Sequence, residues 1–129
     1  MGVVLYTSGS HVAEAFGIGK APVSGQYKVY KMVNDWKTRS GYSTVRGLWV
    51  SGADSSDYSY VSSYADARIN YPYNHFFTNK TRTDAFYCSQ LAWRAWTNTG
   101  FDIDANGGSA VWPVDIFNDS QTTVFYSKG

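Results

Sequence analysis

The chain has 129 residues, which is enough for one domain with a single hydrophobic core. Eleven Lys and Arg residues balance ten Asp and Glu residues, so the formal net charge is only +1. No basic run would follow a phosphate backbone, and we expect no nucleic-acid partner. No apolar run is long enough to span a membrane, and no charged-then-apolar leader precedes the first predicted strand.

Cysteine content and composition limit the chemistry further. A single cysteine excludes an internal disulfide and a zinc site built from several cysteines, so this thiol is either a packing group or a reactive one. Aromatic residues make up 18% of the chain and charged residues only 16%. Together with many Tyr, Ser, Thr, Asn and Gly residues, this balance is typical of exported bacterial proteins. We therefore expect a secreted or cell-surface location.

The first part of the chain predicts strands. Residues 2–6 and 11–16 are short apolar segments on either side of a glycine-containing loop, which predicts a β-hairpin. Residues 26–33 alternate like a strand but have no single apolar face, so we expect both faces to be partly covered. Residues 43–50 alternate as a further strand.

Two helices are predicted next. Residues 58–70 place apolar side chains at helical spacing, after Asp and Ser residues that can cap a helix. Either Thr83 or Asp84 can cap the second helix, and Gly100 is suited to end it. The two helices are thus separated by a loop.

The last elements are short. Residues 112–116 contain a proline suited to the start of a single helical turn, and residues 122–126 predict a final strand. The chain shows no internal repeat and no linker. We therefore expect residues 1–129 to form one α+β domain, with a small antiparallel sheet packed against the second helix.

The only cysteine, Cys88, lies in the first turns of the second predicted helix. The first N–H groups of a helix have no partner within the helix, and with the helix dipole they favour a thiolate over a thiol. Cys88 is therefore a candidate nucleophile. The alternative is that it packs as a small buried hydrophobic side chain.

Three segments around Cys88 carry a family resemblance. They are Tyr-Cys-Ser-Gln-Leu-Ala-Trp at residues 87–93, Gly-Phe-Asp-Ile-Asp at residues 100–104 and Trp-Pro-Val-Asp-Ile at residues 112–116. They resemble the nucleophile region of the permuted NlpC/P60 (YiiX/YebB-like) branch of the papain-like cysteine hydrolases. The resemblance implies a papain-like α+β fold of permuted order, with Cys88 as the nucleophile.

The N-terminal segments are similar to the same family. Its pattern is His-x-Gly-Val/Ile-Val followed by Val-x-Glu-Ala, and this chain has Gly-Val-Val at residues 2–4 and Val-Ala-Glu-Ala at residues 12–15. The resemblance implies that Glu14 orients the catalytic histidine, which falls one residue before Met1. We therefore expect a chain truncated at its N-terminus, with a natural variant that has lost its base as the alternative. In either case the chain as written should be a very poor enzyme.

Four other residues are candidates for the site. His11 lies three residues before Glu14, and this odd spacing puts the two on opposite faces of a strand. His75 lies in the loop between the helices. Neither histidine aligns with the family's base, and both are kept as possible substitutes. The family's oxyanion hole uses the backbone N–H of the cysteine, and Tyr87 and Tyr73 are possible second donors unless their rings only pack.

We expect no metal ion and no cofactor. Asp102, Asp104 and Asp115 do not have the spacing of an EF-hand loop, and capping or turn roles account for them. The resemblance implies hydrolysis of amide bonds in a peptide or a cell-wall-type peptide. Two alternatives stay open: a catalytically silent module that binds a peptide or glycan, and a hydrolase or acyltransferase that acts on lipid esters or amides. Nothing in the sequence indicates an oligomeric state.

Overall fold

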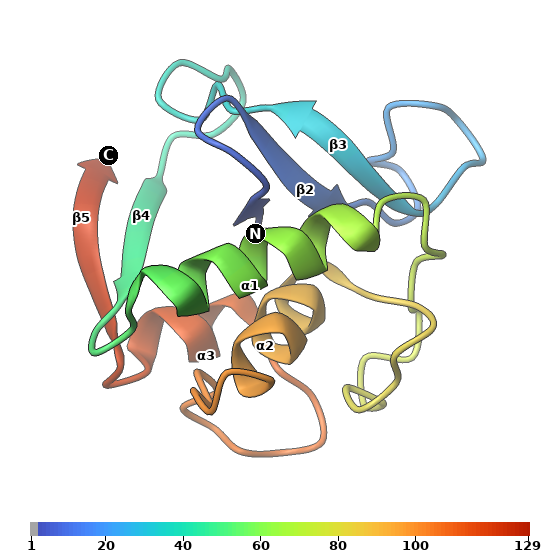
Figure 1. Cartoon of the computed structure of the whole chain (residues 1–129). Coiled ribbons are helices and arrows are strands. Elements are labelled where there is room, and N and C mark those ends of the chain that lie inside the picture. Colours follow the sequence, from blue (N-terminus) through green and yellow to red (C-terminus); the bar gives the residue numbers. More distant parts are fainter. Residues whose placement is uncertain (1–2) are drawn as a thin grey trace.

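A computed structural model describes residues 3–129 as an α+β fold with two antiparallel sheets and three helices (Figure 1). One sheet has the strand order β1-β2-β3, and the other pairs β4 with β5. The α+β class and the antiparallel pairing were predicted, but the strands form two small sheets rather than one. The strands are β1 (Leu5–Tyr6), β2 (His11–Ala15), β3 (Val29–Val33), β4 (Val45–Val50) and β5 (Thr122–Lys128).

The central strand β2 is covered on both faces. Ala13 is opposite Leu5 of β1, and both belong to the main core. Because side chains alternate along a strand, Val12 and Glu14 point to the other face. Both are buried there, with exposed fractions of 0% and 5%. Glu14 thus lies on the face of β2 opposite Ala13.

The strand predicted over residues 26–33 is shorter in the structure and begins at Val29. The residues just before it pair with the segment that follows the first helix. Tyr73 donates its N–H to the carbonyl of Tyr27 at 3.0 Å, and Lys28 forms an isolated bridge with Pro72. This pairing brings the loop that contains Tyr73 alongside the first sheet.

The first helix, α1 (Ser55–Ala67), begins one turn earlier than predicted from residues 58–70. The reason is a capping box. Oδ1 of Asp54 accepts the N–H of Asp57 at 2.9 Å, and Oδ2 of Asp57 accepts the N–H of Asp54 at 3.1 Å. The backbone N–H groups of Asp54 and Asp57 gain hydrogen-bond acceptors in this way, so the helix includes the Ser55–Asp57 turn.

The second helix, α2 (Cys88–Thr97), begins later than its predicted cap. The prediction of Thr83 or Asp84 as the cap is wrong, because Tyr87 occupies the N-cap position. The carboxylate of Asp84 instead pairs with the guanidinium of Arg82. As a result Cys88 is the first residue of the helix.

Gly100 follows α2 with φ of 94°, in the left-handed region, as expected of a residue that ends a helix. The predicted single turn is α3 (Pro113–Asn118), with Pro113 at its start. The final strand runs to Lys128, two residues beyond the predicted range of 122–126.

The core lies between the helices and the first sheet. Figure 1 shows α1 and α2 side by side, with β4 and β5 at one side of the helices and β2 and β3 above them. Tyr58 and Tyr64 of α1 pack edge-on against Trp96 and Phe86, with ring centroids 5.2 and 6.3 Å apart. Over residues 3–129, no helix is long and apolar enough to cross a membrane.

Candidate functional site

Cys88 is a partly exposed free thiol at the first position of α2. Tyr87 before it has an extended backbone, with φ of −91° and ψ of 168°. In the described part of the chain, no acceptor takes the N–H of Cys88. A partly exposed thiol therefore lies beside a free backbone donor.

The two neighbours of Cys88 hold loops around it. The hydroxyl of Tyr87 donates to the carbonyl of Phe77 at 2.9 Å and accepts the N–H of Val111 at 3.1 Å. The hydroxyl of Ser89 donates to the carbonyl of Val111 at 2.6 Å. Because both of its hydrogen bonds are made inside the protein, the Tyr87 hydroxyl holds two loops together and is not free to bind a ligand.

Gln90 ties a third segment to the start of α2 and is completely buried. Its Oε1 accepts the N–H of Tyr87 at 2.9 Å and Nδ2 of Asn74 at 3.0 Å. Its Nε2 lies within hydrogen-bond distance of three carbonyl oxygens of one loop, those of Lys80, Arg82 and Ala85. The loop that precedes α2 is therefore fixed by a single side-chain amide.

Asn74 is also completely buried. Besides its bond to Gln90, its Nδ2 donates to the carbonyl of Asn79 at 3.0 Å, and its Oδ1 accepts the N–H of Phe76 at 2.9 Å. In the sequence this residue looks like part of a polar loop. Its role comes from its proximity to Gln90 of α2, which no local sequence pattern encodes.

Tyr73 lies close to Cys88. It forms a parallel bridge with Phe86, two residues before Cys88. Burial raises the pKa of Tyr73 to about 12, and the negative charge of the Cys88 thiolate and then that of Tyr87 add to the increase. Within residues 3–129 the Tyr73 hydroxyl has no hydrogen-bond partner, so it is available to donate to a ligand.

The two histidines lie on different segments of the fold. The ring of His75 packs edge-on against Tyr73, with centroids 4.9 Å apart. His11 lies on β2, where Nδ1 is 2.8 Å from the hydroxyl of Ser10. In the described residues, neither histidine forms a hydrogen bond with Cys88.

Glu14 is engaged by a residue that sequence reasoning missed. Nη1 of Arg39 donates to Oε1 of Glu14 at 2.8 Å, and Nε of Arg39 donates to Asp35 at 2.7 Å. Burial raises the pKa of Glu14, and the Arg39 guanidinium opposes that increase. No hydrogen bond joins Glu14 to Cys88 or to a histidine in residues 3–129. Because 25 residues separate Arg39 from Glu14, no sequence motif indicates the pair.

An aromatic surface flanks the start of α2. The Phe77 ring lies 5.3 Å from that of Tyr87 and 5.6 Å from that of Trp112. Phe77 is 38% exposed and Trp112 is 43% exposed. We call Phe77 and Trp112 the aromatic wall. In an adjoining loop, Nζ of Lys80 pairs with Oδ2 of Asp104 at 2.7 Å.

The aspartates considered for a metal site have structural roles. Asp102 accepts the indole N–H of Trp93 at 2.8 Å, and Asp115 accepts the N–H of Trp112 at 2.8 Å. Asp104 binds Lys80. In the part of the chain that the structure describes, no group of three His, Cys, Asp or Glu side chains is placed to hold a metal ion.

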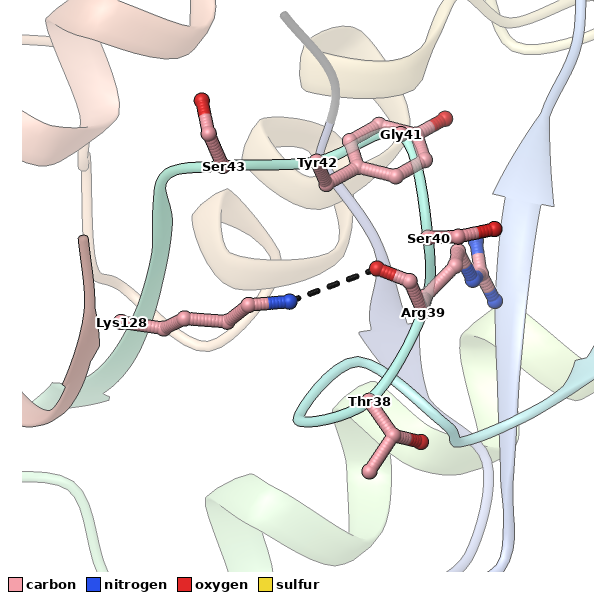
Figure 2. Close-up of a pocket in the computed structure, with 7 residues that line it drawn as sticks. All are labelled: Thr38, Arg39, Ser40, Gly41, Tyr42, Ser43 and Lys128. Carbon is pink, nitrogen blue, oxygen red and sulfur yellow. Dashed lines mark hydrogen bonds between the residues drawn. The ribbon is translucent and has the colours of Figure 1, made fainter.

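A surface hollow of about 460 Å³ lies on the Arg39 loop and not at Cys88 (Figure 2). Nζ of Lys128 reaches across it to the carbonyl of Arg39 at 3.3 Å. Its lining consists of Thr38, Arg39, Ser40, Gly41, Tyr42, Ser43 and Lys128.

Comparison with known proteins identifies the fold. No family model matches the chain. The uncharacterized protein YycO of Bacillus subtilis (strain 168) is 30% identical over 125 residues, with 94% of this chain and 46% of YycO covered. The chain thus spans less than half the length of this curated relative.

The fold is similar to a solved structure. The crystal structure of the metalloprotein YiiX from Escherichia coli O157:H7, a DUF1105 protein, matches with a TM-score of 0.58 at 15% identity, and the match covers 98% of this chain and 81% of YiiX. The predicted resemblance to YiiX-like proteins and the papain-like α+β fold are confirmed.

Proposed function

We propose that this chain, which has the fold of the YiiX-like proteins, is a thiol hydrolase domain that acts on amide bonds of peptide or cell-wall-type substrates. The observation that supports it best is the arrangement at Cys88. This partly exposed thiol lies at the first position of a helix and, among residues 3–129, neither its backbone N–H nor the hydroxyl of the nearby Tyr73 has a hydrogen-bond partner. Substrates of this class would place the protein at or outside the cell surface, which its composition also favours.

The chemistry follows from these groups. The Cys88 thiolate sulfur forms a bond to the carbonyl carbon, and the carbonyl π electrons move to the oxygen. The N–H of Cys88 and the hydroxyl of Tyr73 donate to that oxyanion. The carbon–nitrogen bond then breaks, the amine leaves with a proton, and water hydrolyses the thioester to a carboxylic acid and the free thiol.

The leaving amine requires a proton donor, and we assign this role to a histidine. By family resemblance its place is the position directly before Met1, while His11 and His75 are the alternatives. Glu14 is the proposed orienting residue. Its Oε1 binds Arg39, and its Oε2 has no hydrogen-bond partner among residues 3–129, so one oxygen is left to accept an imidazole N–H.

The aromatic wall supports a second candidate function. Phe77 and Trp112 are exposed, uncharged and in contact with each other, which suits a module that binds a peptide or glycan without cleaving it. The same uncharged surface also suits the acyl chain of a lipid ester or amide, so both alternatives are included in the test.

The test compares four proteins: the chain as given, the chain with a histidine inserted directly before Met1, and the Cys88→Ala variant of each. Hydrolysis is measured on peptide amides, cell-wall peptides and lipid esters. We expect the added histidine to raise peptide-amide hydrolysis by about 100-fold or more, and Cys88→Ala to abolish the gain. Hydrolysis only of lipid esters would favour the lipid alternative. Binding of a peptide or glycan with no Cys88-dependent turnover in any protein would favour the binding module.

A further inference from the structure

Two segments that meet near Cys88 share a buried contact between amide side chains. Nδ2 of Asn74 donates to Oε1 of Gln90 at 3.0 Å, and both residues have an exposed fraction of 0%. Burying two amides is costly unless their polar atoms are paired. Here each of the four polar atoms has a partner within the protein, so the contact has one favoured geometry.

Each amide is linked through the neighbouring backbone to one of the free donors near the thiol. Oε1 of Gln90 also accepts the N–H of Tyr87, the residue whose carbonyl is bonded to the nitrogen of Cys88. Asn74 directly follows Tyr73, and its own N–H donates to the carbonyl of Phe86 at 3.2 Å. The contact thus joins the peptide unit of Cys88 to the segment that places the Tyr73 hydroxyl.

We propose that Asn74 and Gln90 are positioning residues, whose mutual hydrogen bond holds the Tyr73 hydroxyl and the Cys88 N–H where both donate to one substrate oxygen. The proposal rests on the proposed function, because that oxygen is the oxyanion of the reacting carbonyl. Neither amide touches the substrate. Their effect is exerted through Tyr73 and through the backbone at Cys88.

The substitution that tests this is Asn74→Asp. It keeps the size of the side chain and the oxygen that accepts the N–H of Phe76. It replaces Nδ2 with a second oxygen, which then faces Oε1 of Gln90 at about the same separation, so two acceptors repel where a bond existed. The same change at the exposed Asn106 is the matched control.

The measurement is the binding of a small peptide aldehyde, which needs no turnover. The Cys88 sulfur bonds to the aldehyde carbon, and the thiol proton passes to the oxygen, giving a hemithioacetal whose oxygen occupies the place of the oxyanion. We expect Tyr73→Phe and Asn74→Asp each to weaken the adduct about tenfold. The double variant should be weakened by less than the product of the two single effects, because part of the Asn74 effect passes through Tyr73. Asn106→Asp should bind like the wild type.

Independent effects of the two substitutions would overturn the proposal, as would an Asn74→Asp effect no larger than that of Asn106→Asp, or a wild type that forms no aldehyde adduct. Gln90→Met is carried through the same cycle, so the test holds even where Asn74→Asp does not fold. Alkylation of Cys88 by iodoacetamide should stay within about twofold in all variants that fold, since it requires no oxyanion donor. If the cycle is non-additive but no amide is hydrolysed, the positioning role stands and the hydrolase function fails.

Discussion

Arg39 and Glu14 form a largely buried ion pair, in which Nη1 lies 2.8 Å from Oε1 and the side chains are 14% and 6% exposed. Glu14 belongs to the central strand of the first sheet, and Arg39 belongs to the loop after β3. The guanidinium also binds Asp35 and stacks on Trp36, 4.0 Å from the ring centre. One side chain therefore attaches the whole loop to the sheet.

We predict that Arg39→Met destabilises the fold by about 3 kcal/mol at neutral pH, because it leaves the Glu14 carboxylate buried without a counter-charge. The free energy of unfolding in urea measures this. The matched control is Lys31→Met. Lys31 and Asp66 are about half exposed, and loss of such a surface pair should cost less than about 1 kcal/mol. Equal losses in the two variants would contradict the structural role of Arg39.

The pH dependence of the Arg39→Met variant has a definite sign. Burial already raises the pKa of Glu14 above its ordinary value of 4.5, and without Arg39 the pKa should rise further. Below pH 4.5 such a carboxyl group is mostly protonated in both the folded and the unfolded state, so its burial lowers the free energy of unfolding least there. The free energy of unfolding then falls as the pH rises through the folded-state pKa. The loss relative to wild type should therefore be smaller at pH 4 than at pH 7. A loss that grows on acidification would contradict this.

The pKa of Tyr73 provides a direct test of its proximity to the Cys88 thiol. Its pKa is raised to about 12 first by burial and then by the charge of Cys88. In Cys88→Ala the second cause disappears and the first stays. The pKa should therefore fall but remain above the ordinary value of 10.0. Near-ultraviolet titration of phenolate formation, taken as the difference from Tyr73→Phe, isolates this residue among eleven tyrosines. An unchanged pKa would show that the two groups are not neighbours.

The position of the thiol could be predicted from sequence, because the determinants of a helix start are local. Cys88 lies in a continuous motif, and Gly100 and Pro113 mark the ends of elements by their own backbone preferences. The prediction of Thr83 or Asp84 as the cap was wrong because a local pattern does not show which partner a polar side chain will bind. Asp84 found a different partner, and the extended residue Tyr87 took its place at the helix start.

The supporting residues could not be predicted, because each acts across a long sequence separation. Asn74 meets Gln90 sixteen residues later, and Arg39 meets Glu14 twenty-five residues earlier. Within its own strand or loop, none of these residues belongs to a sequence pattern that distinguishes it from a solvent-exposed polar side chain. The neighbours of Gln90 at helical spacing include the polar residues Arg94 and Thr97, so its position on the helix does not indicate burial either.

The aromatic wall should select the reagents that reach Cys88. Three alkylating amides are compared, carrying a neutral phenyl, a carboxylate or an ammonium group, and the rate constant of each is divided by that of its methyl analogue. We predict that this ratio is several-fold larger for the phenyl reagent than for either charged reagent. Trp112→Ala should remove most of this preference. Trp49→Ala is the control, because Trp49 is 51% exposed on β4 and is not part of the wall. Second-order rate constants measured by mass spectrometry give the ratios. Equal ratios in the two variants would exclude the wall as a binding surface.

Gly17 offers a way to move Tyr73 without changing it. A Cβ at Gly17 would lie 2.8 and 2.9 Å from the Cε1 and Cζ atoms of the Tyr73 ring, so we expect Gly17→Ala to displace the ring. At Gly9, nothing lies within 4 Å of the added carbon, so Gly9→Ala is the matched control.

We predict that Gly17→Ala lowers the pKa of Tyr73, because the displaced ring becomes more solvated and lies farther from the charge of Cys88. The fold should lose only about 1–2 kcal/mol, since the half-buried ring can move outward. Gly9→Ala should change neither quantity. The phenolate difference titration and urea unfolding measure the two effects separately. Large destabilisation with an unchanged pKa would contradict this prediction. It would mean that the backbone at Gly17 moves and that the Tyr73 ring keeps its position near Cys88.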